Sequence, residues 1–155
     1  MRGMLRARRR GLFRREYDIE SDAGPLTTLA GARREGCEFT LDGAGYRIER
    51  ETRKRFTLHG PGDRVATAER NTGREWAVQA ASGSLKLVKP SMWRSVWEVH
   101  QNGSARGSVN REGAFSRTVV ADVPADVPSP VAVLTLYVAL VNYEREANAA
   151  AAASS

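Results

Sequence analysis

The sequence has a single cysteine, two histidines and no apolar run long enough to cross a membrane, and each shortage excludes a class of protein. Cys37 is the only cysteine in 155 residues, so the chain cannot form an internal disulfide. The longest apolar run, residues 131–141, has 11 residues with one threonine inside it, whereas a membrane-spanning helix needs about 18 to 20. We therefore expect neither a disulfide-stabilised scaffold nor a transmembrane helix.

The residue patterns that carry catalysis are also scarce. His59 and His100 have no cysteine or acidic partner at metal-ligand spacing, and no serine lies in a Gly-x-Ser-x-Gly turn. No glycine-rich phosphate loop opens a helix. Cys37 alternates with Phe39 and Leu41, which indicates a small core residue rather than a reactive thiol. We expect a protein that is not an enzyme, with no catalytic residue, no metal site and no cofactor.

Lysine is rare, and the positive charge is concentrated at one end of the chain. The 21 arginines against three lysines, with abundant alanine, are typical of a GC-rich bacterial genome. Of the formal charge of +6, residues 1–15 contribute seven arginines and no acid, which leaves a net charge of −1 on the other 140 residues. We interpret residues 1–11 as a flexible basic arm that precedes a nearly neutral domain.

Turn residues recur about every 10 residues through most of the chain, as at Asp42-Gly43, Gly60–Asp63, Asn71–Gly73 and Asn102-Gly103. The segments between them alternate apolar and polar residues, which is typical of antiparallel strands with one face in water. Asn102-Gly103 is the best hairpin signal, because a type I′ turn needs positive φ at both central residues. The pattern predicts about ten to twelve strands joined as hairpins.

A different pattern begins after the prolines of residues 124–128. Ser129 and Pro130 suit the cap and first residue of a helix, which we expect over about residues 129–146. The run that follows is apolar on every side of a helix, so the helix must be buried all round; a strand is the alternative. The predicted helix core consists of Val131, Val133, Leu134, Leu136, Tyr137, Val138, Leu140 and Val141. The Ala-rich residues 147–155 are expected to be disordered or a frayed helix.

The two patterns together predict the fold. Barrels of eight strands are filled by their own side chains, whereas larger barrels can hold a central helix. We therefore expect a mainly β protein, a closed antiparallel β-barrel of about 10–12 strands that encloses the carboxy-terminal hydrophobic α-helix. Residues 12–146 would form this single domain.

This layout resembles the tubby carboxy-terminal-like superfamily, which includes the tubby, phospholipid scramblase and LURP-one-related families. The resemblance rests on the opening Tyr17–Gly24, the hairpin of residues 93–103 and the final helix ending in Asn142–Arg145. Together with the composition, it suggests a bacterial member of the superfamily. It implies a closed barrel with the helix threaded through it. Tubby domains bind phosphoinositides and scramblases are associated with calcium and acidic lipids, but this sequence has neither an acidic cluster after the barrel nor a cysteine cluster.

The basic arm is the feature that most suggests a partner. Several arginines beside an anionic lipid leaflet contribute about 1 kcal/mol each, and the same charge would also attract nucleic acid. A solubilising tail or a mis-assigned start are the alternatives. The candidate lipid- or anion-binding residues are Arg2, Arg6, Arg8, Arg9, Arg10, Arg14 and Arg15.

A second basic patch is expected if two hairpins that are distant in sequence lie side by side. Its members are Arg53, Lys54, Arg55, Lys86 and Lys89. The three tryptophans, Trp76, Trp93 and Trp97, are expected to pack in the core or at the rim rather than to form a stacking platform for bases.

The leading hypothesis is a non-catalytic tubby-like barrel that acts as a binding or scaffold module on an anionic phospholipid membrane. The basic amino terminus is not followed by the apolar segment of a signal peptide, so we expect a cytoplasmic protein that attaches peripherally at the inner face of the membrane. The alternatives are a nucleic-acid-associated protein, a barrel enzyme or binder of a small apolar ligand, and a module for a protein partner that the sequence does not identify.

Overall fold

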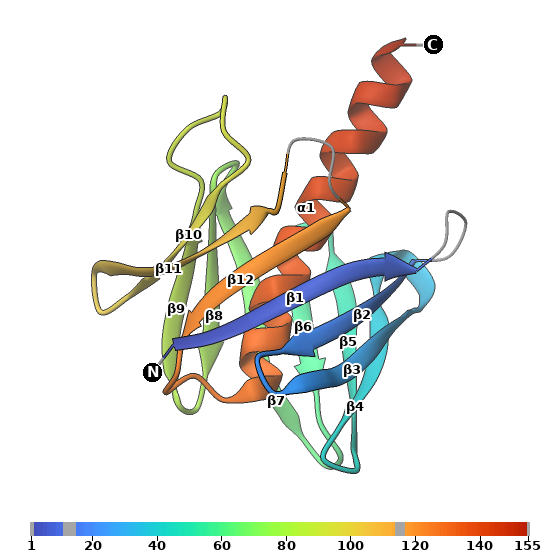
Figure 1. The fold of residues 1–155 in the computed structure, drawn as a ribbon, viewed down its shortest axis with the longest axis vertical. Coiled ribbons are helices and arrows are strands. Elements are labelled where there is room, and N and C mark those ends of the chain that lie inside the picture. Colours follow the sequence, from blue (N-terminus) through green and yellow to red (C-terminus); the bar gives the residue numbers. More distant parts are fainter. Residues whose placement is uncertain (1, 11–14, 114–116, 155) are drawn as a thin grey trace.

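A computed structural model of the chain describes residues 2–10, 15–113 and 117–154. Within these residues, 12 antiparallel strands form a closed barrel around one long α-helix (Figure 1), which confirms the predicted fold class. The elements are β1 (Arg2–Arg10), β2 (Glu16–Ser21), β3 (Gly24–Gly31), η1 (Arg33–Glu35), β4 (Cys37–Leu41), β5 (Ala44–Thr52), β6 (Arg55–His59), β7 (Arg64–Thr72), β8 (Glu75–Ala80), β9 (Gly83–Val88), β10 (Trp97–Gln101), β11 (Ser104–Arg111), β12 (Thr118–Pro124) and α1 (Ser129–Ser154).

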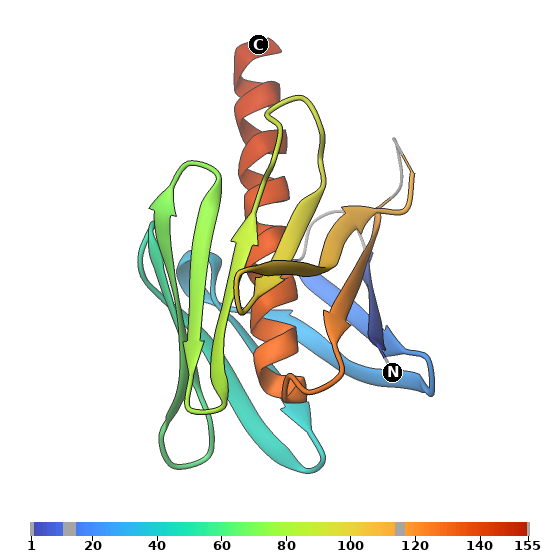
Figure 2. The same cartoon turned by 90° about the vertical axis from the view of Figure 1, so that its left-hand side faces the viewer.

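The strands form a meander in which each strand pairs with its neighbours along the chain, and β1 closes the ring by pairing with β12. Because every pairing is antiparallel, successive connections lie at opposite ends of the barrel. The helix enters after β12 at one end and leaves at the other, where its last turns project beyond the strands (Figures 1 and 2). The barrel therefore has two ends, each formed by a different set of connections.

The predicted flexible arm is wrong, because residues 2–10 form strand β1. Arg2 to Arg8 pair with β12, and Leu5 to Arg10 pair with β2. Leu5 and Ala7 point into the core and are 8% and 0% exposed. The barrel domain thus begins at β1 and not at residue 12.

Period-two alternation places one face of each strand in the core, as the sequence predicted. In β4 the burial alternates strictly, with Cys37, Phe39 and Leu41 inside. Trp76 and Trp97 are 0% and 1% exposed, which confirms their predicted packing.

Trp93 does not follow this prediction, because its side chain is 96% exposed. Strand β9 ends at Val88 and β10 begins only at Trp97. Pro90 lies between them and has no N–H to offer a ladder. Residues 89–96 therefore leave the sheet, and alternation with Trp97 has no meaning there.

Two hairpin turns show the backbone geometry that their sequences require. Asn102 and Gly103 have φ angles of 53° and 80°, and they connect β10 to β11 with Gln101 opposite Ser104. Asp42 and Gly43 join β4 to β5 in the same way, with φ angles of 50° and 78°. Both are turns with two left-handed residues, as type I′ geometry demands, and the predicted Asn102-Gly103 hairpin is confirmed.

Helix α1 fills the barrel. All residues from Val131 to Val141 are buried, including each of the eight predicted core residues. The threonine in this run, Thr135, donates its hydroxyl to the Val131 carbonyl at 2.8 Å, so the apolar lumen has no unpaired hydroxyl at that position. A helix without a polar stripe is stable here because strands surround it on all sides.

The helix continues past the expected boundary near residue 146 and ends at Ser154. Of the two alternatives for the Ala-rich tail, the structure shows helix over residues 147–154. Residues 147–154 are exposed, and alanine has the highest intrinsic helix propensity, so the buried turns act as a template for the exposed ones. In the part of the chain that the structure describes, no helix combines the length and apolarity that a membrane span requires.

Candidate functional site

The two ends of the barrel carry opposite charge. We call the end from which α1 leaves the basic end; its connections contain nine cations and two acids among the described residues. The connections of the other end, which we call the acidic end, contain four aspartates and no lysine or arginine. The cations are Arg15, Arg33, Arg34, Arg53, Lys54, Arg74, Lys89, Arg94 and Arg117. The aspartates are Asp22, Asp42, Asp63 and Asp126.

Most of the charge at the basic end is uncompensated. Arg15 and Lys89 are exceptions, since they bind Glu144 and Glu146 of α1 at 3.0 and 2.7 Å. The other seven cations are exposed, and within the described ranges none of them forms an ion pair. The basic end therefore presents seven free positive charges to solvent.

The same end carries the most exposed large apolar side chains of the described residues. Met92 and Trp93 are 75% and 96% exposed, and they lie in the connection between β9 and β10, a loop that extends beyond these strands (Figure 1). The Ser91 hydroxyl accepts the Trp93 N–H at 3.2 Å, which makes the local turn that presents the two side chains. Arg94 follows directly. We call residues 92–94 the apolar tip.

Both ends of this connection are fixed by hydrogen bonds to the barrel and the helix. On one side, the Lys89 N–H donates to the Arg74 carbonyl at 2.8 Å, and its ammonium binds Glu146. On the other side, the Tyr143 hydroxyl donates to the Ser95 carbonyl. The apolar tip is thus displayed by an anchored loop, and its exposure is not the result of an untethered chain.

Below the surface, a cluster of charged side chains fixes the helix where it leaves the barrel. The Glu35 carboxylate accepts two hydrogen bonds from Arg145, both at 2.8 Å, and one from Arg50 at 2.9 Å. Glu144, on the same turn of α1, accepts the Tyr17 hydroxyl at 2.6 Å and pairs with Arg15. We call these residues the exit cluster.

The exit cluster also stabilises the backbone of the turn that carries two of the free cations, Arg33 and Arg34. Arg34 and Glu35 have φ angles of 54° and 65°, a region that residues other than glycine rarely adopt. The Tyr137 hydroxyl donates to the Glu35 carbonyl at 2.6 Å, and the Glu35 side chain is fixed by its arginines. Contacts with α1 therefore stabilise a strained turn that presents Arg33 and Arg34 to solvent.

The protonation state of Glu35 couples this cluster to pH. Burial alone would raise its pKa, but the hydrogen bonds and charges of Arg145 and Arg50 together outweigh burial and hold the pKa below its ordinary value. A carboxyl whose pKa is lowered by folding stabilises the folded state above its unfolded pKa, about 4.3. That stabilisation is lost as the pH falls through the folded pKa.

Replacing Glu35 with glutamine is expected to reduce the free energy of unfolding by roughly 2 to 3 kcal/mol at pH 7. Fully buried pairs lose about 3 to 5 kcal/mol when one partner is removed, and some exposure of Glu35 and its arginines lowers that figure. Urea unfolding at several pH values measures it. The difference from the natural protein should shrink as the pH falls below about 4. Glu112→Gln, at an exposed connection, is the matched control, and equal loss in both variants would contradict the assignment.

The structure does not gather the predicted arm residues into one free patch. Arg6, Arg8 and Arg10 are exposed on β1, where the register places them opposite Glu20, Asp18 and Glu16 of β2. Arg10 contacts Asp18 at 3.4 Å and Glu16 at 3.8 Å. Arg9 is exposed, Arg2 contributes its backbone to β1, and Arg14 lies outside the described residues. Charge that is uncompensated along the sequence therefore meets acids across the strands.

The predicted second basic patch is wrong, because β7 and β8 separate its two halves. Arg53 and Lys54 lie in the turn between β5 and β6, whereas Lys86 and Lys89 belong to β9 and the connection after it. Arg55 is neutralised by Glu51 at 2.7 Å and by Glu69 at 3.2 Å. Only Arg53 and Lys54 of this set contribute free charge to the basic end.

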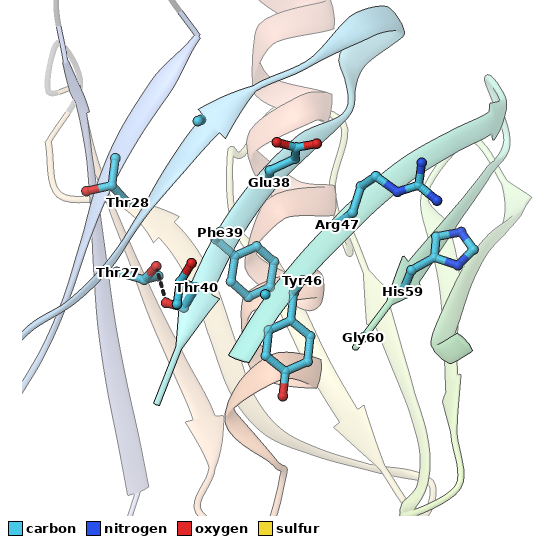
Figure 3. Close-up of a pocket in the computed structure, with 11 residues that line it drawn as sticks. Thr27, Thr28, Glu38, Phe39, Thr40, Tyr46, Arg47, His59 and Gly60 are labelled. Atoms are coloured by element: carbon cyan, nitrogen blue, oxygen red, sulfur yellow. Dashed lines mark hydrogen bonds between the residues drawn. The ribbon is translucent and has the colours of Figure 1, made fainter. Parts of the chain in front are cut away.

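A hollow of about 690 Å³, lined by both polar and apolar residues, lies over β3, β4, β5 and β6 (Figure 3). The hollow lies where β3 and β4 separate, because these two strands pair only at Ala30 with Glu38 and at Gly31 with Cys37. The Thr27 hydroxyl bridges the two strands further down by donating to the Thr40 carbonyl at 2.7 Å.

Charged side chains along these strands pair with one another. Arg47 and His59 project from adjacent strands (Figure 3) and both lie near Glu49, at 3.4 and 3.7 Å. These strands therefore show the charge pairing of a wet sheet face rather than the geometry of a nucleophile and its base.

Other chemical candidates are buried or isolated. Burial raises the pKa of the Cys37 thiol to about 12, so the thiol stays protonated, in agreement with a core cysteine. Among the described residues, no three side chains of the metal-ligating types are grouped as a metal site requires. Among the described residues, the basic end is where exposed apolar side chains and exposed cations without an ion pair occur together.

Sequence reasoning missed this site because it followed charge along the chain. In a meander, successive turns lie at opposite ends, so sorting the turns alternately would have separated Asp22, Asp42 and Asp63 from the cations. The cationic connection of residues 32–36 was not recognised as a turn, because no Asn-Gly or Pro-Gly signal accompanies Arg33 and Arg34. A hairpin end at Arg53 and Lys54 was expected, but its position at the same end of the barrel as the other cations was not. Trp93 was missed because its spacing suggested a strand.

In comparisons with protein-family models, with curated proteins and with solved structures, no match to this chain was found.

Proposed function

We propose that the protein is a non-catalytic binding module that docks on anionic phospholipid surfaces through the basic end of its barrel. The observation that carries this proposal is the exposed pair Met92 and Trp93 at an end where seven of the described cations form no ion pair. Basic residues near an anionic leaflet contribute about 1 kcal/mol each. Tryptophan favours the membrane interface, because its largely apolar ring can contact the lipid there while its N–H stays hydrated.

The end of the helix is compatible with such docking. Beyond Glu146, residues 147–154 of α1 carry no charged side chain, so the projecting turns add no acid to the docking end. The acids of α1 at this end, Glu144 and Glu146, are bound to Arg15 and Lys89. Of the two acids in the described connections of this end, Glu35 is bound to Arg50 and Arg145, and Glu112 is exposed. The approach of a negative surface to the free cations is therefore not opposed by free carboxylates of the helix.

The proposal extends to location and family. A peripheral position at the cytoplasmic face of a membrane follows from docking on anionic lipid. Membership of the tubby carboxy-terminal-like superfamily is supported by the layout of a closed meander barrel around a carboxy-terminal helix, with each strand joined to the next. Neither point adds residues to the site.

Tryptophan fluorescence tests the docking directly, because Trp93 is exposed and the other two tryptophans are buried. Adding vesicles that contain phosphatidylglycerol is expected to shift the emission to shorter wavelength, as the Trp93 ring enters the interface. Phosphatidylcholine vesicles should produce no shift. Trp93→Phe should abolish the shift while most of the binding, measured by vesicle sedimentation, is retained.

Charge reversal at one turn provides the second arm of the test. Arg53→Glu with Lys54→Glu is expected to weaken vesicle binding at least tenfold, since two contributions of about 1 kcal/mol are lost. Arg64→Glu with Arg106→Glu changes the net charge equally at exposed positions of β7 and β11 outside the basic end and should bind as the natural protein does. Equal loss in both double variants, or no binding at all, would refute the proposal. Tight, salt-dependent binding to DNA without a fluorescence shift would favour the nucleic-acid alternative.

A further inference from the structure

The acidic end contains a second feature without a partner, an apolar hollow of about 390 Å³. It lies where α1 enters the barrel, between the start of β1, the turn after β2, the end of β12 and the first turn of the helix. Its apolar lining includes Met4, Leu5, Leu26, Val123, Val127 and Ala132. The volume is within the range of about 300 to 1,000 Å³ found for pockets that enclose a small molecule, which is ample for one large side chain.

Among the described side chains, the charged groups beside this hollow are two aspartates. Asp22 lines it, and Asp126 lies in the connection between β12 and α1 that forms one of its walls. Both aspartates are exposed, and within the described ranges neither forms an ion pair. A molecule that fills the hollow would therefore gain by placing a cation beside its apolar part.

The apolar tip at the opposite end has this composition. Met92 and Trp93 are apolar and exposed, Arg94 follows them directly, and both ends of their loop are anchored. Polarity and charge both match: one end offers exposed apolar side chains beside an arginine, and the other offers an apolar hollow beside aspartates. The ends as a whole are complementary too, with seven free cations against four aspartates.

We propose that the occupant of the hollow is a second copy of this chain, with the apolar tip of one molecule inserted into the acidic-end hollow of the next. Such a contact joins two different surfaces, so each molecule keeps one free tip and one free hollow. A heterologous contact of this kind propagates into rings or open chains rather than stopping at a dimer. Exposed aromatic and arginine side chains that enter a pocket are the usual centres of binding energy in such interfaces.

Two properties follow from the residues involved. Because free charges of opposite sign face each other, assembly should weaken as salt is added and screens them. Because Trp93 serves both contacts, assembly and vesicle docking should exclude each other at the tip. Anionic vesicles would then release single molecules from the assembled state.

Sedimentation velocity over a concentration series of the full chain tests the assembly at low ionic strength, where screening is weakest. The natural protein should sediment faster as its concentration rises, and added salt should reverse this. Trp93→Ser and Arg94→Glu, which alter the tip, should each weaken the association at least about tenfold. Asp22→Lys combined with Asp126→Lys, which alters the hollow, should do the same. Circular dichroism melting verifies that each variant is folded.

Mixing the variants gives the decisive result. Trp93→Ser retains an intact hollow, and the double aspartate variant retains an intact tip, so a mixture is expected to form one-to-one dimers and nothing larger. At a concentration where the mixture dimerises, each variant alone should remain monomeric, because its own contact is at least about tenfold weaker. A natural protein that is monomeric at all concentrations overturns the proposal, as does a mixture that stays monomeric or a variant that assembles alone.

The same variants separate this inference from the proposed function. The double aspartate variant leaves the basic end unchanged, so it should bind phosphatidylglycerol vesicles with the Trp93 emission shift and yet fail to assemble. Loss of assembly with vesicle binding retained would therefore concern the hollow alone. Assembly without vesicle binding would refute membrane docking and leave the contact between copies in place.

Discussion

Removal of residues 2–10 is expected to produce a chain that does not fold into the barrel. Strand β1 pairs with β12 on one side and β2 on the other, so its loss opens the ring and uncovers the apolar helix. Each main-chain hydrogen bond contributes about 0.5 to 1.5 kcal/mol net, and the whole fold is stabilised by only about 5 to 15 kcal/mol. The two new strand edges would also invite aggregation.

Expression, solubility and thermal melting by circular dichroism measure this effect. The matched control keeps the strand and removes its charge: Arg6→Gln with Arg8→Gln changes two exposed side chains of β1 and should fold normally, with a stability within about 1 kcal/mol of the natural protein. A soluble truncated chain that melts cooperatively at the natural temperature would contradict the role of β1. It would restore the interpretation of these residues as an arm.

The strands and the helix could be predicted because local pattern and tertiary environment agree there. In β4 and β8, apolar residues alternate with polar ones and the turns carry residues suited to them. The run from Val131 to Val141 has no polar stripe, and only burial on all sides accommodates that. Structure can be predicted from sequence where local preference and tertiary packing favour the same conformation.

Strand β1 could not be recognised because its composition hides its alternation. Only Leu5 and Ala7 face the core, and arginines occupy most of the other positions, which resembles a basic tail. What makes it a strand is supplied elsewhere in the chain: Glu16, Asp18 and Glu20 of β2 lie opposite its arginines. Cross-strand pairing of opposite charges stabilises a sheet, and no inspection of residues 1–15 alone would reveal it.

The candidate site becomes visible only when the charged residues are assigned to the two ends of the barrel, and the sequence alone does not suggest that assignment. Net charge by region gave a basic arm and a neutral domain, whereas net charge by barrel end gives seven excess cations at one end and four excess acids at the other. The exit cluster then connects this surface to the interior, because Glu35 binds Arg145 of the helix and holds the turn of Arg33 and Arg34. Surface electrostatics and helix position are therefore parts of one arrangement.

Substitution of Leu136 by aspartate should abolish folding, whereas the same charge placed further along the helix should have almost no effect. Leu136 is 0% exposed in the centre of the lumen, so the variant loses the packing worth about 2 to 5 kcal/mol in Leu→Ala and must also bury a carboxyl, at several kcal/mol. Together these costs approach the whole stability of a domain. Ala151→Asp, on the exposed final turns of the same helix, is the control and should alter stability by about 0.5 kcal/mol at most. Urea unfolding compares the two, with Leu136→Ala as an intermediate variant. A soluble Leu136→Asp protein with the natural unfolding midpoint would show that the lumen admits water and that α1 does not form the core.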